Sequence, residues 1–541
     1  LPYVVLKLGF GPNLSLVSAF LGFVCFSAWG RRRAPSSVEL NAAQAAGTSA
    51  GTTAFFSVLL AAFDLLNAKP ELGFALHLQT LEIFLWFSLA GTLGVFLAIP
   101  FRRHFIDDEA LPFVGGAVAG ETILALSADT GQARSRTRAL GLGFGVAAVV
   151  AACRSSALKL IPEVTAFSAS LEKLRMGMGW SLLSFGSGML IGVRVTLSMG
   201  LGMVLSWLVL PPWLLERGYI AEPTFAATLR WVMWPATGLM VSGGLTTLLL
   251  SWRKIVKALS SLRLRHTPEG PRDHEVPLAV TIGGVVLLTI ALCVVQSVFL
   301  GMSVFVTLAS IALSFPLILI GTRVLGETNY APISALANAA QGALGVFFPG
   351  SIAINMVGSG LAGLLPASGE HLMQNQRATR VVGGRPDHTT AIHVMAVCVG
   401  ALMAAWVYPL LRDRYGLGEQ GLSSPASVKW AGFAELLSRG VEGLAPGSLP
   451  ALAVGLALGV VLALLEPRFK SAVPSATGIG MGMLTPGAVV LPMVLGGLAG
   501  AVWRRRSPST EQVYQMPLAS GFVAGEAIVA LVVPILGLLK R

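Results

Sequence analysis

Charged residues are scarce in this chain. Asp, Glu, Lys and Arg make up 12% of its 541 residues, whereas soluble domains carry about 25%. Hydrophobic residues make up 54%, and the mean hydropathy is +0.74. This composition excludes an ordinary soluble domain. The apolar runs are continuous rather than alternating, which also disfavours a transmembrane barrel. We therefore expect an all-α integral membrane protein.

Cysteine and histidine are scarce as well. The four cysteines stand singly in apolar segments: Cys25, Cys153, Cys293 and Cys398. This arrangement predicts neither a disulfide framework nor a cysteine metal site. His388 and His393 are five residues apart, which is not the spacing of two ligands on one helical face. HExxH, Walker, Rossmann and GxSxG motifs are also lacking, so we expect no metal, no cofactor and no enzyme activity.

The net charge of +12 does not indicate nucleic-acid binding. The basic residues cluster in short loops between apolar runs, at residues 31–33, 102–103, 134–138, 253–272 and 504–506. Such loops are typical of the cytoplasmic side of a membrane. Residues 504–506 and 540–541 flank one apolar run, so the rule leaves the topology of the last helix open. The first residue is Leu1 rather than Met, and we expect a segment to precede it.

The apolar runs indicate a polytopic bundle. A run of about 20 residues crosses a bilayer, and we find roughly fourteen to sixteen such runs. Many of the 62 glycines lie inside them, where small residues let helices approach closely. Where Gly is combined with Pro, as in residues 474–486, we expect interrupted or re-entrant helices.

Two motifs occur twice, in the same order. Asn-Ala-Ala-Gln occupies residues 41–44 and 338–341, and Trp-Pro-Ala-Thr-Gly-Leu-Met-Val-Ser-Gly at 234–243 is echoed by Met-Pro-Leu-Ala-Ser-Gly-Phe-Val-Ala-Gly at 516–525. These echoes predict a duplicated bundle, a common design of secondary transporters. We predict a first transmembrane repeat at 1–252, a basic loop at 253–276 and a second repeat at 277–541.

Acidic residues inside apolar runs are candidates for proton coupling, because an ionisable group in a bilayer is costly unless it is paired or hydrated. Glu121, Asp129 and Glu526 are these candidates, and residues 118–123 and 523–528 form matching contexts for two of them. The alternative for each acid is a structural ion pair or a position near the headgroups. Arg194 interrupts another apolar run, and we expect it to pair with one of these acids.

Buried amides suggest where a polar substrate binds. Asn41 and Gln44 share one helix face with Thr48, and Asn338 and Gln341 share another. These side chains suit either a peptide backbone or hydrogen bonding between helices, and the sequence does not decide between the two.

Residues 370–376 form a polar island in the second half of the chain. Glu370 and Gln374 are one turn apart, and we expect both to face a cavity. His371 titrates near neutral pH in its unperturbed state, and it suits a cavity or a loop equally well.

Several segments resemble the oligopeptide transporter family, specifically bacterial members close to the yellow stripe-like branch. Residues 94–103 look like its Pro-x-Arg-Arg signature, and residues 111–121 like its Pro-Phe-Pro-x-Gly-x-Ala-x-Ala-Glu stretch. Residues 326–334 are similar to a Thr-Asp/Asn-x-x-Pro segment, 372–374 to Asp-Leu-Met-Gln-Asp, and 478–486 to Gly-Ile-Gly-Met-x-x-Pro. Asn329 lies in the third match and joins the expected substrate-binding residues. The arrangement around Glu370 and His371, with Asn375 where an acid is common, departs from the family pattern.

The resemblance implies a helical carrier of peptides or peptide-like metal chelates, usually coupled to protons, in two pseudo-repeated halves. We therefore expect a transporter of short peptides in the cell inner membrane that rocks one half against the other, with the substrate held between the 41–44 and 338–341 helices. Its expected partners are the small-molecule substrate, protons and the lipid bilayer; a homodimer is kept open. The rivals are a carrier of metal chelates, a membrane-embedded enzyme and a channel.

Overall fold

The computed structural model describes residues 1–8, 14–28, 35–127, 131–155, 160–250, 275–328, 331, 333–418, 421–439, 447–469 and 472–539. The first part of the chain forms α1 (Pro2–Leu8), α2 (Leu14–Ala28), α3 (Ser37–Phe55), α4 (Ser57–Asn67), η1 (Pro70–Leu72), α5 (Thr80–Ala98), η2 (Ile99–Phe101), η3 (Arg103–Asp108), α6 (Val114–Ser127), α7 (Gly131–Arg154), β1 (Val164–Ala166), α8 (Ala169–Lys173), β2 (Gly177–Gly179), α9 (Leu182–Ile191), α10 (Val193–Val204), η4 (Leu205–Val209), α11 (Leu210–Glu216) and α12 (Phe225–Leu250). η3 and η4 are π-helical turns, and η1 and η2 are 3-10 turns.

The second part forms α14 (Leu278–Phe299), α15 (Val304–Thr328), α16 (Ile333–Phe347), α17 (Ile352–Val382), α18 (Pro386–Tyr415), α19 (Pro425–Arg439), α20 (Ser448–Phe469), α21 (Ala476–Leu484), α22 (Gly487–Arg506) and α23 (Pro508–Leu539). The predicted loop at 253–276 lies outside the described residues, apart from its last two positions, so the repeat boundaries stay a prediction.

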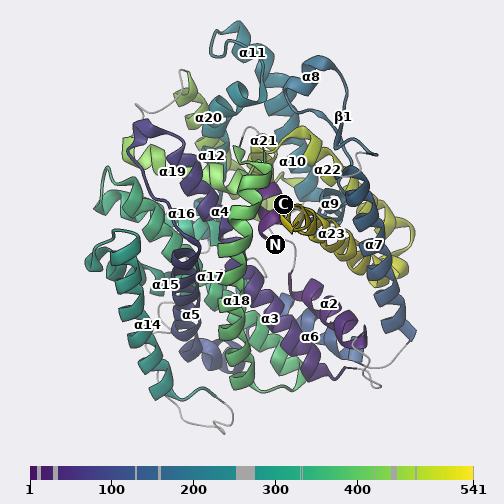
Figure 1. The fold of residues 1–541 in the computed structure, drawn as a ribbon, viewed down its shortest axis with the longest axis vertical. Helices are drawn as coiled ribbons and strands as arrows, with labels where there is room; N and C mark the ends of the chain where they lie inside the picture. The colour runs from purple at the N-terminus through teal and green to yellow at the C-terminus, as the bar shows by residue number, and fades with distance from the viewer. Residues whose placement is uncertain are drawn as a thin grey trace.

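The structure confirms the all-α polytopic architecture (Figure 1). Within the described ranges, 10 helices are long and apolar enough to cross a membrane, and Val17–Phe26, Val114–Leu124 and Leu182–Ile191 are shorter apolar helices. The count of fourteen to sixteen crossings stays a prediction, because several other helices are too short or not apolar enough to be counted as membrane spans on these criteria alone.

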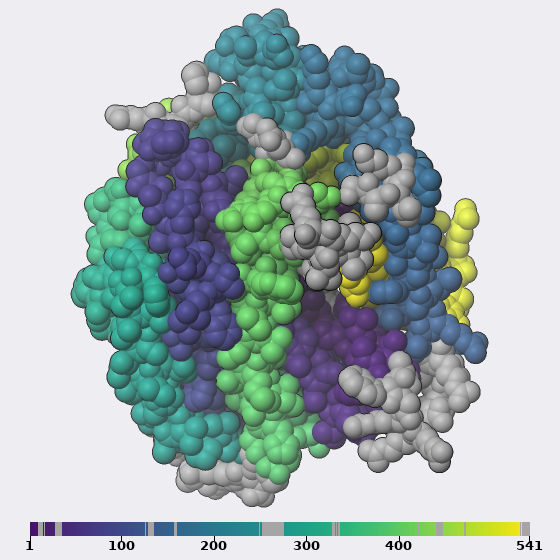
Figure 2. All heavy atoms as spheres, viewed as in Figure 1, coloured from purple at the N-terminus to yellow at the C-terminus, as the bar shows by residue number. Residues whose placement is uncertain are grey.

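α17 is the central helix and α14 a peripheral one. In α17, 89% of the most apolar window is buried inside the protein, against 22% in α14. α17 packs against α3, α5, α6, α15 and α16. Figure 2 shows α14 and α15 (teal) at one edge of the molecule, with α5 (dark blue) and then α18 (green) beside them. Polar side chains on α17 are therefore shielded from lipid by protein.

Two glycines allow close helix crossings in the first bundle. A Cβ on Gly94 of α5 would lie 2.4 Å from the Leu365 carbonyl oxygen of α17, and one on Gly400 of α18 would lie 2.2 Å from the Ala50 carbonyl oxygen of α3. Any larger residue at either position would meet backbone rather than a movable side chain. Glycines at such crossings let helix backbones approach closely, and side chains of α3, α17 and α18 hydrogen-bond to one another.

The helices pack as two bundles that do not coincide with the two halves of the sequence. The first bundle contains α1–α6 and α14–α19, and the second contains α7, α9, α10, α12 and α20–α23. In Figure 1 the first bundle fills the lower left and centre, and much of the second lies toward the upper right. Each bundle takes helices from both halves, so a motion of one sequence half against the other does not fit this packing.

The packing partners are reciprocal. α3 packs on α18 as α17 packs on α5, α7 packs on α23 as α20 packs on α12, and α9 packs on α22 as α21 packs on α10. Two interleaved repeats would give this pattern. In such repeats α12 would be the equivalent of α23, and these two helices carry the longer echo. The equivalent of α3 would be α17, whereas the second copy of the short Asn-Ala-Ala-Gln echo lies on α16.

Two interrupted helices lie in the second bundle. α9 ends at Ile191, and α10 begins directly after Gly192, whose φ of +93° favours glycine. α21 ends at Leu484, within the Gly- and Pro-rich segment where we expected an interruption, and α22 begins after Pro486. Ser181 and Ser475 cap α9 and α21 by accepting backbone N–H groups.

Gly400→Val should destabilise the protein, because its side chain would collide with the α3 backbone. Overpacking of this kind costs about 1–3 kcal/mol, and we expect a lower midpoint of thermal unfolding for the purified protein in detergent. Gly283→Val on α14 is the matched control, because a Cβ there meets nothing within 4 Å. Equal midpoints for the two variants would contradict the proposed close packing.

Candidate functional site

α17 carries a row of buried polar side chains through the middle of the first bundle. Ser368, Glu370, Asn375, Gln376 and Thr379 are each at most 1% exposed. A polar group in such surroundings costs free energy unless it is hydrogen-bonded. The neighbours of this row therefore decide what the site can do.

Asn375 is the centre of a network that joins α3, α17 and α18. Its Oδ1 accepts from Gln44 Nε2 at 3.0 Å, and its Nδ2 donates to Ser49 Oγ at 3.2 Å and to His393 Nδ1 at 3.2 Å. Because the amide nitrogen donates, Nδ1 of His393 accepts, and the proton of the neutral ring is on Nε2. No partner for that Nε2 lies within the described residues.

The predicted residues of α3 all belong to this network. Gln44 Nε2 also lies 2.6 Å from Ser15 Oγ and 3.1 Å from Thr48 Oγ1. Asn41 Nδ2 donates to Thr379 Oγ1 at 2.9 Å. The hydroxyl groups of Thr379 and Thr389 of α18 are hydrogen-bonded to each other at 2.8 Å. The bond between Asn41 and α17 joins segments 338 residues apart in the sequence.

Several buried amide oxygens on α3 and α17 have no partner among the described residues. Asn41 Oδ1, Gln44 Oε1 and Gln376 Oε1 are buried and accept no hydrogen bond from the described residues. Each of these oxygens is a desolvated acceptor, and leaving such a group unsatisfied costs about 1–3 kcal/mol of folding free energy. These oxygens are therefore suited to accept hydrogen bonds from water or from N–H groups of a ligand.

The second predicted amide pair lies elsewhere. Gln341 Nε2 donates to Asn355 Oδ1 at 3.2 Å, near the start of α17, and Asn338 Oδ1 is buried without a partner in the described chain. Asn355 and Asn375 are separated by about 30 Å along α17, at 1.5 Å per residue. The structure does not bring the two amide pairs to a single site, because α17 runs between them.

Glu370 is fully buried, and neither of its carboxylate oxygens has a hydrogen-bond partner in the described ranges. Its Oε1 fits against Gly321 of α15, where a Cβ would lie only 2.0 Å away. Arg323, two residues after Gly321 on α15, pairs with Glu109 at 2.7 Å. A charged carboxylate here would therefore lack both solvation and a counterion.

The other residues of the polar island are less enclosed. His371 is half-buried and its Nδ1 lies 2.8 Å from the Ala367 carbonyl oxygen. Gln374 is also half-buried, and its side chain makes no hydrogen bond to a described residue. Glu370 and Gln374 do lie one turn apart on α17, as expected.

The remaining acidic candidates differ from Glu370. Glu121 is exposed on α6, and it makes neither an ion pair nor a hydrogen bond to the part of the chain described here. Asp129 and Asn329 lie outside the described residues. Arg194 pairs with Glu466 of α20 at 2.8 Å. The expectation that it would pair with one of the candidate acids is wrong. α10 packs against α21 and α22, and α20 packs against α12 and α21, whereas Glu121 and Glu526 are on α6 and α23.

Glu526 is enclosed by donors. Its carboxylate lies 3.1 Å from Lys7 Nζ and 3.3 Å from the Arg154 guanidinium, and it accepts from Ser181 Oγ at 2.8 Å and from the Leu183 backbone N–H at 3.0 Å. Two cations and two further donors stabilise the ionised form. This geometry matches the alternative of a structural ion pair.

The family model described as OPT oligopeptide transporter protein matches residues 2–536. The chain belongs to the OPT oligopeptide transporter family. Membership identifies it as a membrane transporter rather than an enzyme.

Relatives of this OPT-family chain are distant. A Haemophilus influenzae protein named as a candidate oligopeptide transporter is 22% identical over 558 positions, covering 92% of this chain and 87% of that protein. A Saccharomyces cerevisiae protein named in the same way is 20% identical, and the match spans 64% of this chain but only 57% of that protein. An Arabidopsis thaliana protein named as a provisional metal–nicotianamine transporter is 20% identical over 83% of this chain and 73% of its own length.

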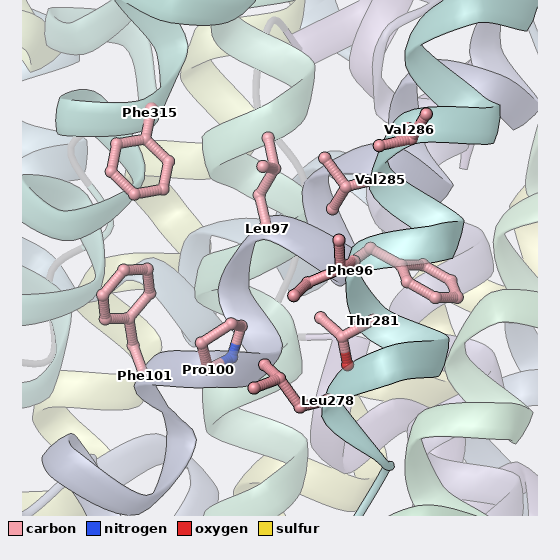
Figure 3. Close-up of a pocket in the computed structure, with 10 residues that line it drawn as sticks. Phe96, Leu97, Pro100, Phe101, Leu278, Thr281, Val285, Val286 and Phe315 are labelled. Carbon is pink, nitrogen blue, oxygen red and sulfur yellow. The ribbon is translucent and has the colours of Figure 1, made fainter. Parts of the chain in front are cut away.

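An apolar cavity of about 320 Å³ lies apart from the polar network. It is lined by the end of α5 with η2, by α14 and by Phe315 of α15 (Figure 3). The one polar side chain that lines it, Thr281, donates to the Pro277 carbonyl oxygen. The cavity therefore offers nothing to recognise a peptide or a chelate.

The sequence of this transporter did not identify some residues of the site. The sequence marks Asn375 only as a departure from the family pattern and His393 only as half of a histidine pair with the wrong spacing for a metal. Thr379, four residues after Asn375, was not singled out. The four-residue spacing of Asn375 and Thr379 was the available signal. Lys7 and Arg154 lie far from Glu526 in the sequence, and no local pattern connects them.

Asn375→Ala should destabilise the transporter, because Gln44, Ser49 and His393 lose a buried partner. Leaving buried groups unsatisfied costs about 1–3 kcal/mol, and the midpoint of thermal unfolding in detergent should fall. Gln374→Ala is the matched control on the neighbouring residue. If both variants unfold at the wild-type temperature, the network does not stabilise the bundle.

Proposed function

We propose that this OPT-family protein is a proton-coupled secondary transporter of short oligopeptides in the cell inner membrane, and that it works by alternating access. The observation that carries the proposal is Glu370, a fully buried acid with no counterion and no hydrogen-bond donor among the described residues. Carrying a charged carboxylate through a bilayer is costly, whereas the protonated acid is neutral. Glu370 is therefore the best candidate for the proton carrier.

The α3–α17–α18 network supplies the proposed substrate contacts. The unpartnered oxygens of Asn41, Gln44 and Gln376 are acceptors, and backbone N–H groups and an α-ammonium group are the donors of a short peptide. A substrate that provides these hydrogen bonds removes the cost of three desolvated acceptors. Glu370 lies on the same helix, within two turns of Asn375, so proton and peptide binding share α17.

Alternating access is proposed to move the first bundle against the second. The two bundles share few contacts compared with the packing inside each. The breaks between α9 and α10 and between α21 and α22 give the second bundle two interrupted helices, which are typical of substrate pathways in carriers. This motion replaces the expected rocking of sequence halves.

A carrier of metal chelates is the second candidate, favoured by the similarity to the named metal–nicotianamine transporter. In the described residues, no group of three His, Cys, Asp or Glu side chains is placed to hold a metal ion. A chelate hides its metal from the protein, so the same amide network would bind its polar groups.

Glu370→Gln should abolish accumulation driven by an inward proton gradient in proteoliposomes, because glutamine cannot exchange a proton. Counterflow of peptide without a gradient should persist, because the amide keeps the size and polarity of the neutral acid. Glu121→Gln in the same assay is the comparison, since Glu121 is exposed, and it should keep gradient-driven uptake. The reverse result would assign coupling to Glu121.

Uptake of labelled tripeptides and of a labelled iron chelate should separate the two candidate substrates. We expect the tripeptides to accumulate under an inward proton gradient and to be released by a protonophore. Accumulation of the chelate alone would identify a metal-chelate carrier.

A further inference from the structure

The Glu526 cluster lies where the two bundles meet. Lys7 is on α1, which packs against α4, α18 and α19 of the first bundle. Arg154 ends α7, Ser181 and Leu183 begin α9, and Glu526 is on α23, all in the second bundle. The cluster also lies beside the β1–β2 hairpin, because Arg154 Nη1 donates to the Trp180 carbonyl oxygen and Trp180 Nε1 to Thr165 of β1.

The groups around Glu526 form a built anion site. Two cations, a hydroxyl and a backbone N–H converge on a carboxylate that is 1% exposed, at distances of 2.8–3.3 Å. The N–H belongs to the first turn of α9, where helix geometry presents donors to an anion. This is the set of groups that recognises a carboxylate.

The cluster carries one positive charge more than Glu526 neutralises. Lys7 and Arg154 together bear two positive charges, and Glu526 bears one negative charge. Glu163 also attracts the Arg154 charge electrostatically, but its side chain is exposed on the segment before β1. Tyr3 contributes a neutral hydroxyl 3.3 Å from Lys7. The Arg154 side chain is 9% exposed, and its Nε has no hydrogen-bond partner in the described chain. A buried excess charge with an unused donor favours binding of a second anion.

We propose that Arg154 and Lys7 bind a carboxylate of the transported molecule beside Glu526, which neutralises the cluster. This inference rests on the proposed transport function and specifies its substrate class as carboxylate-bearing. The C-terminus of a peptide and the carboxylates of a chelator share this chemistry. Because Arg154 Nε is closed off here, the ligand enters when the bundles separate at this boundary.

The test compares uptake of a tripeptide with a free C-terminus and of the same tripeptide with a C-terminal amide, using the full chain in proteoliposomes. A charge-assisted hydrogen bond distinguishes the two by about ten-fold or more, so the free acid should have a KM lower by that factor. Arg154→Gln should bring the ratio of the two KM values close to one while uptake of the amide persists.

Two further variants separate recognition from folding. Glu526→Gln leaves two uncompensated cations and should strengthen the preference for the free acid, a direction that loss of a structural ion pair would not produce. Arg194→Gln removes an arginine paired with Glu466 and should leave the preference unchanged. Equal uptake of acid and amide by the wild type, or an unchanged preference in Arg154→Gln, would overturn the inference while peptide transport stands.

If neither peptide accumulates, the peptide function has failed, and the question passes to the chelate. The same comparison is then made with a labelled iron chelate and its carboxamide analogue. Preference for the carboxylate form that Arg154→Gln abolishes supports the inference, and equal uptake of both forms overturns it.

Discussion

A polar helix can run through the centre of a membrane protein only if neighbouring helices come close enough to satisfy its side chains. In this transporter α17 depends on that condition. Gly94 and Gly400 let α5 and α18 approach the backbones of α17 and α3, and Asn375 then reaches Gln44 on one side and His393 on the other. Larger residues at these crossings would separate the helices and leave the polar row without partners.

The two buried acids face opposite environments. Glu370 has no cation or donor among the described residues, whereas Glu526 has four donors. Burial without a partner favours the neutral, protonated form of a carboxyl group, whereas several cations and donors around it favour the ionised form. The two sites are therefore suited to different tasks: the proposed proton exchange at Glu370 and the proposed binding of an anionic group beside Glu526.

The interleaving of the halves has a mechanical consequence. Because each bundle contains helices from both halves of the sequence, the chain crosses the boundary between the bundles several times, and α1 meets α23 there. The cluster around Glu526 lies at this boundary, and the interrupted helices α9 and α21 lie on its second-bundle side. A ligand bound there would contact both bodies at once, which couples its binding to their relative position.

The sequence by itself determined the membrane class, the helical fold and the family, because hydropathy and short motifs are local properties. It also identified Asn41, Gln44, Thr48 and Glu370 as unusual for apolar helices, and predicted an interrupted helix within residues 474–486. Their roles depended on distant partners. Asn41 bonds a residue 338 positions away, and the two amide pairs that share a motif lie at opposite ends of α17.

Only the tertiary structure decided which acids are paired and which helices form one body. Glu526 and Glu370 are both acids next to a small residue in apolar runs, yet Lys7 and Arg154 reach only the first of them. The charge state and hydrogen bonding of a buried group are set by atoms within a few ångströms, and most of those atoms come from remote parts of the chain. Local sequence therefore identified the candidates, and packing assigned their chemistry.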